Sequence, residues 1–228
     1  MAWHEPLVLV TPGGGQDGYD VVDACVKGLL ALPPEQRPRT HIVCGPEMGA
    51  APRAAIAQAA LNLPQVSLQD FSDDMMSLMA ASDVVVSMGG YNTVCELLTL
   101  RKRAIVVPRA RPGVEQTIRT QRMARLGLLR AIDPSTLSPA LLMGAIQDEL
   151  AAHARGEERA HLNGMKGLDE VSQALLEWLD LDTSVLRKGR TPTLTAASAV
   201  HRERPASFIS MEKSWHTPIP PPVGTLAC

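Results

Sequence analysis

This chain has few aromatic side chains, little net charge and no paired cysteines. Aromatic residues make up 3% of its 228 residues, too few for the stacking platforms with which proteins bind single-stranded nucleic acid. The formal net charge is −2 at pH 7, which provides no attraction to nucleic acid or to an anionic membrane surface. We therefore expect no nucleic-acid partner.

The sequence shows no pattern typical of a disulfide framework, a metal site or a membrane span. The four cysteines are Cys25, Cys44, Cys95 and Cys228, without a C-x-x-C pair. Three of them fall in apolar strand or helix contexts, as reduced core residues of a cytoplasmic protein do. The six histidines lack metal-ligand spacing, so we expect no metal. No signal peptide opens the chain, and no apolar run approaches ~18 residues, so we expect no transmembrane segment.

Strand and helix signals alternate through most of the chain, which is typical of an α/β fold with a Rossmann-like, doubly wound parallel sheet. One folded domain is predicted over residues 6–182. A poorly ordered, weakly basic tail is predicted over 183–228, which carries six of the 18 prolines. The predicted strands are 7–10, 41–44, 66–68, 83–86, 104–107 and 128–132, and the predicted helices are 20–30, 53–61, 73–80, 93–100, 116–126, 139–151 and 169–179.

The most informative motif is S-M-G-G-Y-N-T-V-C-E, residues 87–96, between an apolar strand and a helix. The paired Gly89 and Gly90 let the backbone approach a ligand closely. The first turn of the helix offers free N–H groups and a positive dipole end, which suit phosphate. Asn92 is expected to cap this helix, and Glu96 to accept hydrogen bonds from a ribose. The motif predicts a nucleotide or nucleotide-sugar site; the alternative is a helix cap with Glu96 solvated.

A second glycine cluster follows the first strand, where residues 13–18 satisfy G-x-G-x-x-G. In a doubly wound sheet, ligands bind beyond the carboxyl ends of the strands, so both clusters belong to one edge. The pattern invites a dinucleotide-binding interpretation, which requires an acidic residue at the end of the second strand. Glu47 lies too far along for that role, and Asp17 would put a negative charge into the phosphate turn. We therefore disfavour the dinucleotide interpretation.

Four pieces of the sequence together resemble the C-terminal, donor-binding half of a GT-B glycosyltransferase. The closest branch is the bacterial enzymes that transfer GlcNAc from UDP-GlcNAc to the lipid-linked peptidoglycan precursor. The resemblance covers about residues 6–165 and implies half of a GT-B fold, with 6–182 as the donor-binding domain. The pieces are T-P-G-G-G at 11–15, D-F-S-D-D-M at 70–75 with the strand that ends at Ser87, G-G-Y-N-T-V-C-E at 89–96, and V-P at 107–108 with E-Q at 115–116 and A-R-L-G-L at 124–128.

The resemblance implies a role for each matched residue. Phe71 would contact the nucleotide base through its backbone, and Glu96 would hold the ribose hydroxyls. Glu115 and Gln116 would bind the transferred sugar. The diphosphate would lie on the glycine turns and the start of the helix, with backbone donors in place of any required cofactor or metal. The full set of predicted donor-binding residues is Gly13, Gly14, Gly15, Phe71, Met75, Gly89, Gly90, Asn92, Thr93, Glu96, Arg109, Glu115 and Gln116.

Two departures from the family pattern stand out. Met88 replaces a histidine of related plant-type enzymes, so Arg109 and Arg111 are candidates for the missing positive charge. Only six residues precede the first strand, so the acceptor-binding half and its general base are expected in another domain or a partner chain. We expect a UDP-sugar-dependent hexosyltransferase half, cytoplasmic and at the inner membrane face, that is inactive alone. The alternatives are half of a sugar-nucleotide epimerase, a dinucleotide-binding module and a non-catalytic partner subunit.

Overall fold

The computed structural model describes residues 5–109 and 113–160, which lie within the first of two units, Met1–Gly164. The predicted helix 169–179, the predicted tail 183–228 and Arg111 lie outside the described residues. In the described part, six strands form one sheet in the order β3-β2-β1-β4-β5-β6, and every pairing is parallel. The predicted fold class, a doubly wound parallel sheet, is confirmed.

The strands and helices alternate along the chain as the sequence predicts. None of the described helices is long and apolar enough to cross a membrane. The strands are β1 (Leu7–Thr11), β2 (Arg39–Val43), β3 (Val66–Gln69), β4 (Val84–Met88), β5 (Arg103–Val107) and β6 (Arg130–Ala131), and the α-helices are α1 (Tyr19–Ala31), α2 (Ala50–Ala60), α3 (Met75–Ala81), α4 (Tyr91–Thr99), α5 (Glu115–Arg125) and α6 (Pro139–Ala154).

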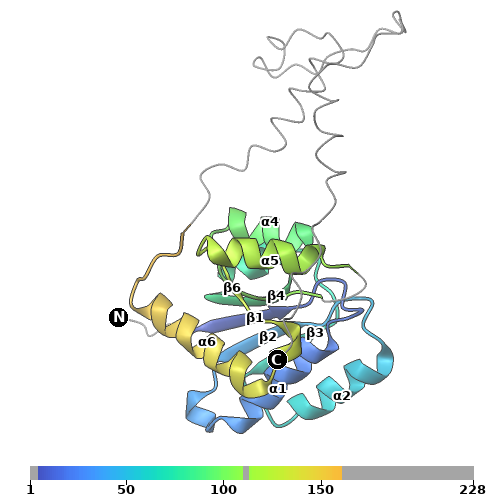
Figure 1. The fold of residues 1–228 in the computed structure, drawn as a ribbon. Coiled ribbons are helices and arrows are strands. Elements are labelled where there is room, and N and C mark those ends of the chain that lie inside the picture. Colours follow the sequence, from blue (N-terminus) through green and yellow to red (C-terminus); the bar gives the residue numbers. More distant parts are fainter. Residues whose placement is uncertain (1–4, 110–112, 161–228) are drawn as a thin grey trace, which may run out of the picture. The chain divides into compact units, whose positions relative to one another are not determined.

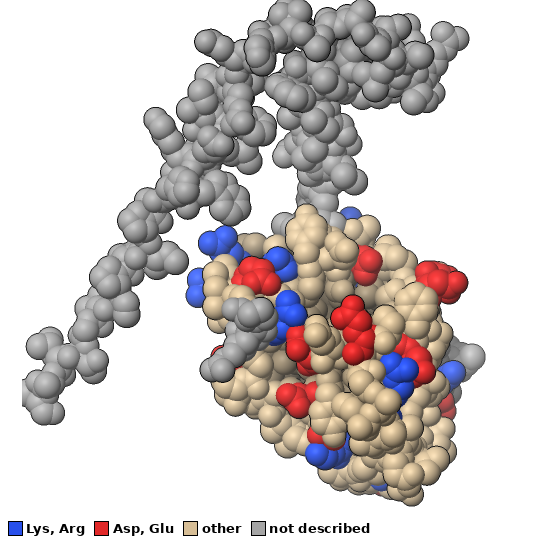
Figure 2. All heavy atoms as spheres, turned by 90° about the vertical axis from the view of Figure 1, so that its right-hand side faces the viewer, with Lys and Arg blue, Asp and Glu red and all other residues tan. Residues whose placement is uncertain are grey.

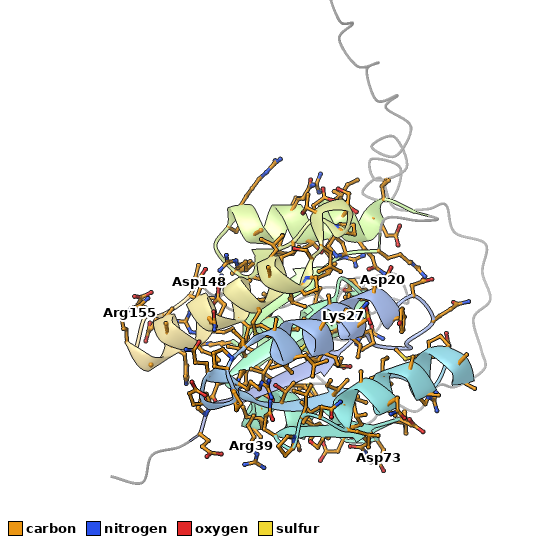
Figure 3. The ribbon with its side chains drawn as sticks, turned by 90° about the horizontal axis from the view of Figure 1, so that it is seen from below. Asp20, Lys27, Arg39, Asp73, Asp148 and Arg155 are labelled. Carbon is orange, nitrogen blue, oxygen red and sulfur yellow. The ribbon has the colours of Figure 1, made fainter. Side chains whose placement is uncertain are left out.

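Helices cover both faces of the sheet, and each face has its own apolar cluster. Figure 1 shows α4 and α5 above the sheet and α1, α2 and α6 below it, and Figure 3 shows α1 between α6 and α2. Because side chains alternate along a strand, Val8 and Val10 pack on the lower cluster and Leu9 on the upper. Met79 of α3 belongs to the upper cluster. The central strands are therefore buried on both faces, as their uninterrupted apolar runs require.

The predicted apolar face of α1 is confirmed. Val21, Val22, Cys25 and Leu29 are all buried, with at most 2% of their surface exposed. Burial raises the pKa of the Cys25 thiol to about 12, so this thiol stays protonated and unreactive at neutral pH. Within the described residues the cysteines are free, and both Cys25 and Cys44 are buried. They are core residues.

Element boundaries differ from the predictions in two places with a clear physical cause. The predicted strand 128–132 shortens to β6, because only Arg130 and Ala131 pair with β5, while Leu128 and Leu129 are buried. The predicted helix 73–80 begins instead at Met75. Asp74 is its N-cap, and its Oδ1 accepts a hydrogen bond from the Ser77 N–H at 3.2 Å. An N-cap residue precedes the first helical residue, so the helix starts after Asp74.

The loops after β1 and β2 pack backbone against backbone, which fixes the floor of the carboxyl edge. Gly45 has φ +91°, and a Cβ built there would lie 2.4 Å from the carbonyl oxygen of Gly13. Gly15 has φ +93°, and its Cβ would lie 2.4 Å from the carbonyl oxygen of Cys44. Residues that carry a side chain rarely adopt such φ values. At both glycines the neighbouring backbone also lies too close to leave room for a Cβ atom. The two glycines therefore hold these loops in contact.

An ionic cluster ties α6 to β5 at the amino edge of the sheet. Arg103 Nη1 donates to Glu149 Oε2 at 3.2 Å, and Arg159 donates to both oxygens of the same carboxylate. The Glu149 side chain is 7% exposed and the Arg103 side chain 10%. A charge buried this deeply has to be paired, so the cluster holds α6 in place.

We predict that Glu149→Gln destabilises the fold by about 3 kcal/mol, because it leaves Arg103 buried beside a neutral group. Asp148→Asn is the matched control on the same helix (Figure 3): Asp148 pairs with Arg130 at 2.8 Å, but its side chain is 68% exposed. It should cost less than about 1 kcal/mol. Urea unfolding measures both. Equal free energies of unfolding for the two variants would contradict the structural role of Glu149.

A second prediction concerns the packed loops. Gly45→Ala should cost about 3 kcal/mol, because it combines a strained φ with a collision against backbone. Gly14→Ala is its control: a Cβ there meets only the movable side chain of Glu47, at 3.4 Å, and the cost should stay below about 1 kcal/mol. Thermal unfolding compares the two. A Gly45→Ala variant as stable as the wild type would show that the loops can separate freely.

Candidate functional site

The candidate site lies at the carboxyl edge of the sheet, where the strand order changes direction. From β1 the chain proceeds outward to β2 and β3, and then returns to β4 on the other side of β1. The loops after β1 and β4 therefore lead to helices on opposite faces and leave a crevice between them. A cleft of about 360 Å³ opens at this point, and it is lined by Pro12, Gly13, Gly14, Gly15, Gln16, Asp17, Glu47, Met88, Gly90, Tyr91, Asn92, Thr93, Arg109 and Gln116.

One wall of the cleft is the N-terminus of α4. Its N-cap is Gly90, which has no side chain to satisfy the first N–H groups. The first bond within the helix runs from the Val94 N–H to the Gly90 carbonyl oxygen at 3.0 Å. The three N–H groups that precede Val94 in the helix have no partner within it, and the positive end of the dipole faces the cleft. This wall is suited to an anion.

The prediction that Asn92 caps this helix is wrong. The helix begins at Tyr91, directly after the glycine pair, because Gly90 itself adopts the extended conformation of an N-cap. Asn92 consequently lies within the first turn, where its side chain lines the cleft together with Thr93. Glu96 follows Asn92 by four residues and lies on the same face of α4, one turn further from the cleft.

The opposite walls come from the loop after β1 and the loop that leads into α5. The Glu47 N–H donates to the Gly14 carbonyl oxygen at 2.8 Å, which anchors the β2 loop beneath the first glycine cluster. Gln116, in the first turn of α5, accepts a hydrogen bond at Oε1 from the Arg109 N–H at 3.0 Å. Gln116 thus holds the backbone after β5 against the cleft.

A salt bridge crosses the mouth of the cleft. Arg109 Nη1 lies 2.9 Å from Asp17 Oδ2, and the two side chains are 34% and 46% exposed. The hydrogen bond to Asp17 raises the pKa of the Arg109 guanidinium above its already high value, so the guanidinium is charged at neutral pH. Figure 2 looks onto this side of the molecule and shows acidic and basic side chains interspersed over it. The described residues of the cleft therefore do not form a basic patch.

Arg119 supports the glycine turn from behind. Its Nη1 donates to the Gly89 carbonyl oxygen at 2.8 Å, and its guanidinium lies 5.4 Å from the centre of the Tyr91 ring. Gly89 is buried beneath the cleft and does not line it. The sequence contains no signal for this contact, because Arg119 lies 30 residues away from Gly89 along the chain.

The structure brings together eight of the predicted donor-binding residues. These eight line the cleft: Gly13, Gly14, Gly15, Gly90, Asn92, Thr93, Arg109 and Gln116. The other five do not line it. Phe71 is 58% exposed after β3, Met75 packs on the upper apolar cluster, and Glu115 is exposed at the start of α5. Gly89 precedes α4, and Glu96 lies on α4 one turn beyond Asn92.

Six residues that line the cleft were absent from the predicted set: Pro12, Gln16, Asp17, Glu47, Met88 and Tyr91. Asp17 and Glu47 entered the sequence argument only as reasons against a dinucleotide. Tyr91 stands directly after the glycine pair, and its side chain is 67% exposed. Position next to a glycine turn is a signal that sequence reasoning could have used for both Asp17 and Tyr91.

A second hollow, of about 260 Å³, lies at the amino edge of the sheet. Several of its charged groups already make contacts within the fold. Lys102 Nζ donates to the carbonyl oxygens of Ala80 and Ser82, each at 2.6 Å, and burial lowers the pKa of Lys102. His153 Nε2 lies 3.1 Å from Asp83 Oδ1. We therefore assign the candidate site to the carboxyl edge. No group of three or more potential ligands for a metal ion occurs among the residues described.

Comparison with known proteins agrees with the geometry. The family model described as "Glycosyltransferase family 28 C-terminal domain" matches residues 7–175. The UDP-N-acetylglucosamine--N-acetylmuramyl-(pentapeptide) pyrophosphoryl-undecaprenol N-acetylglucosamine transferase of Mesorhizobium japonicum is 32% identical over 160 residues, which are 67% of this chain and 42% of that protein. An uncharacterised glycosyltransferase of Methanopyrus kandleri is 29% identical over 162 residues, 68% of this chain and 43% of that protein.

Two solved structures share the fold. Acinetobacter baumannii MurG superposes with a TM-score of 0.57 at 21% identity, covering 76% of this chain and 54% of that one. UDP-GlcNAc 2-epimerase from Neisseria meningitidis, bound to UDP-GlcNAc, superposes with a TM-score of 0.53 at 14% identity, covering 78% of this chain and 45% of that one. At such identities the likeness is one of fold alone.

The chain spans less than half the length of the two curated relatives described. The family model, by contrast, covers most of this chain and the whole of its sheet. The resemblance seen in the sequence is thereby confirmed. The chain belongs to glycosyltransferase family 28 and is a GT-B C-terminal domain of that family.

Proposed function

We propose that this chain is the donor-binding half of a nucleotide-sugar-dependent hexosyltransferase, with a UDP-sugar as the donor. The observation that carries the proposal is the cleft between the first glycine cluster and the N-terminus of α4, at the point where the strand order reverses. A diphosphate placed there meets unpaired helix N–H groups and the positive end of a dipole. The relatives' names supply the choice of uridine.

The remaining roles are those that the family resemblance implies, and of their residues only Gln116 lines the cleft. Glu96, one turn beyond Asn92, is proposed to hold the ribose hydroxyls, and Phe71 to contact the base through its backbone. Gln116 and Glu115, at the start of α5, are proposed to bind the sugar. During transfer, negative charge grows on the departing diphosphate, and preorganised backbone donors stabilise it where it develops. The proposal needs no metal ion.

The acceptor site and the general base are proposed to lie outside the described residues, in a further domain or a partner chain. The matched relatives are more than twice as long as the segment they share with this chain. We propose that the complete assembly works in the cytoplasm at the inner membrane face. The printed name of the Mesorhizobium relative includes an undecaprenol-linked group. This chain alone should bind the donor and transfer little.

An epimerase half is the weaker candidate. The epimerase neighbour is 14% identical to this chain, so its likeness extends to the architecture only. The sequence relatives described above are glycosyltransferases. No contact in the cleft favours epimerisation over transfer.

Calorimetric titration of the full chain with UDP, UDP-GlcNAc, GDP and NAD tests the proposal. We expect the uridine nucleotides to bind and NAD to show no heat of binding. UDP and UDP-GlcNAc should also raise the unfolding temperature of the protein, because a ligand that binds only the native state stabilises it. Equal affinity for NAD, or the absence of binding by any nucleotide diphosphate, would contradict a donor site.

Glu96→Ala should weaken UDP binding by about tenfold, because the ribose loses a hydrogen bond to a charged group. Glu35→Ala removes the same charge from an exposed position beyond the end of α1, and should leave the affinity unchanged. Titration gives the affinity, and thermal unfolding checks that each variant is folded. If both variants bind UDP as the wild type does, Glu96 has no role in holding the ribose.

A further inference from the structure

The charges in the cleft are unusual for a site that receives a diphosphate. Among the described residues that line it, Asp17 and Glu47 are acidic and Arg109 is basic, so one positive and two negative charges give −1. A nucleoside diphosphate brings further negative charge into the same space. Like charges at short range repel, most strongly where solvent is partly excluded. The free cleft thus presents a carboxylate where the ligand needs a cation.

The Arg109 guanidinium is already occupied by an anion. Asp17 Oδ2 lies 2.9 Å from Arg109 Nη1, and the pair joins the loop after β1 to the loop after β5. A phosphate oxygen and a carboxylate oxygen compete for the same N–H donors of a guanidinium. Asp17 belongs to the loop that carries Gly13 to Gly15, and Arg109 lies across the cleft beside Gln116. The salt bridge therefore spans the path to the glycine loop.

The salt bridge is weakly held, which suits a replaceable contact. Both side chains are partly exposed, at 34% and 46%, and exposed ion pairs contribute little to folding. The Arg109 backbone is fixed separately, by its N–H bond to Gln116 Oε1. The guanidinium can thus exchange its anion without any loss of the backbone position.

We propose that Asp17 is an internal competitor for the donor diphosphate and sets the affinity of the cleft for it. Binding of the donor exchanges the Asp17 carboxylate on Arg109 for a phosphate oxygen, with no covalent change. The inference rests on the proposed function, because it takes the diphosphate of a nucleotide-sugar as the incoming anion. A ligand without a strong oxyanion cannot make the exchange, so Asp17 selects for phosphorylated ligands.

The test is calorimetric titration of UDP into the full chain as wild type, Asp17→Asn, Glu47→Gln, Arg109→Gln and the double variant Asp17→Asn with Arg109→Gln. Asp17→Asn should bind UDP about fivefold more tightly, since Arg109 is released for the phosphate. Glu47→Gln is the matched control: it removes the same charge from the same cleft, and no ion pair joins Glu47 to Arg109 among the described contacts. Its gain should stay below about twofold, because only screened repulsion is relieved.

The double variant separates competition from simple repulsion. If Asp17 acts through Arg109, the gain from Asp17→Asn disappears when Arg109 is glutamine, because residues that share a partner do not act additively. The proposal is overturned if the gain persists in that background, if Glu47→Gln gives an equal gain, or if Asp17→Asn binds UDP no better than the wild type. The unfolding midpoint of Asp17→Asn should match the wild type, which excludes a folding defect.

The two proposals fail in different ways. A wild type that binds UDP while Asp17→Asn shows no gain removes the competitor role and leaves the donor site standing. Absence of UDP binding in every variant removes the donor site, and the exchange on Arg109 with it.

Discussion

The reversal of strand order between β1 and β4 is the constraint on which the rest of this structure depends. β1 pairs with β2 on one side and with β4 on the other, and the helices that follow β1 and β4 lie on opposite faces of the sheet. The two loops must therefore part at the carboxyl edge. The cleft, the exposed N-terminus of α4 and the position of the first glycine cluster all follow from this arrangement.

Under the proposed function, the cleft binds its anion with backbone groups more than with the cationic side chains that the structure describes. The N–H groups at the start of α4 are fixed by the helix, so they lose no conformational freedom on binding. A lysine or arginine in their place would have to be ordered at an entropic cost. Among the described residues that line the cleft, the one arginine is paired with Asp17. Under the proposed function, we expect this site to favour a ligand with several phosphate oxygens over a simple anion.

The charged and polar side chains are divided between the two edges of the sheet by how deeply they are buried. At the amino edge, Glu149 and its arginines form a buried cluster, and Lys102 is bound to backbone carbonyls. At the carboxyl edge, the groups around the cleft are partly exposed, and Tyr91 has 67% of its surface in solvent. Parallel sheets commonly show this division, because the strand-to-helix loops at the carboxyl edge vary without disturbing the core. Substitutions of the exposed side chains around the cleft should accordingly affect stability less than substitutions in the Glu149 cluster, whereas Gly45, packed backbone against backbone, belongs to the fold.

The sequence by itself determined the fold class, the order of the elements, the buried face of α1 and the two glycine turns. These features depend on local patterns: apolar runs of strand length, helical periodicity and glycine between a strand and a helix. It also determined eight of the residues that line the cleft, because carboxyl-edge loops converge in any doubly wound sheet. Tertiary structure alone decided that Asp17 meets Arg109 and that Arg119 supports Gly89. It also decided that Phe71 and Met75 stay outside the cleft and that α4 begins at Tyr91. The contacts join residues that are far apart in the chain, and the start of α4 has to be known to the exact residue. No local pattern of residue types encodes the contacts or the exact start of the helix.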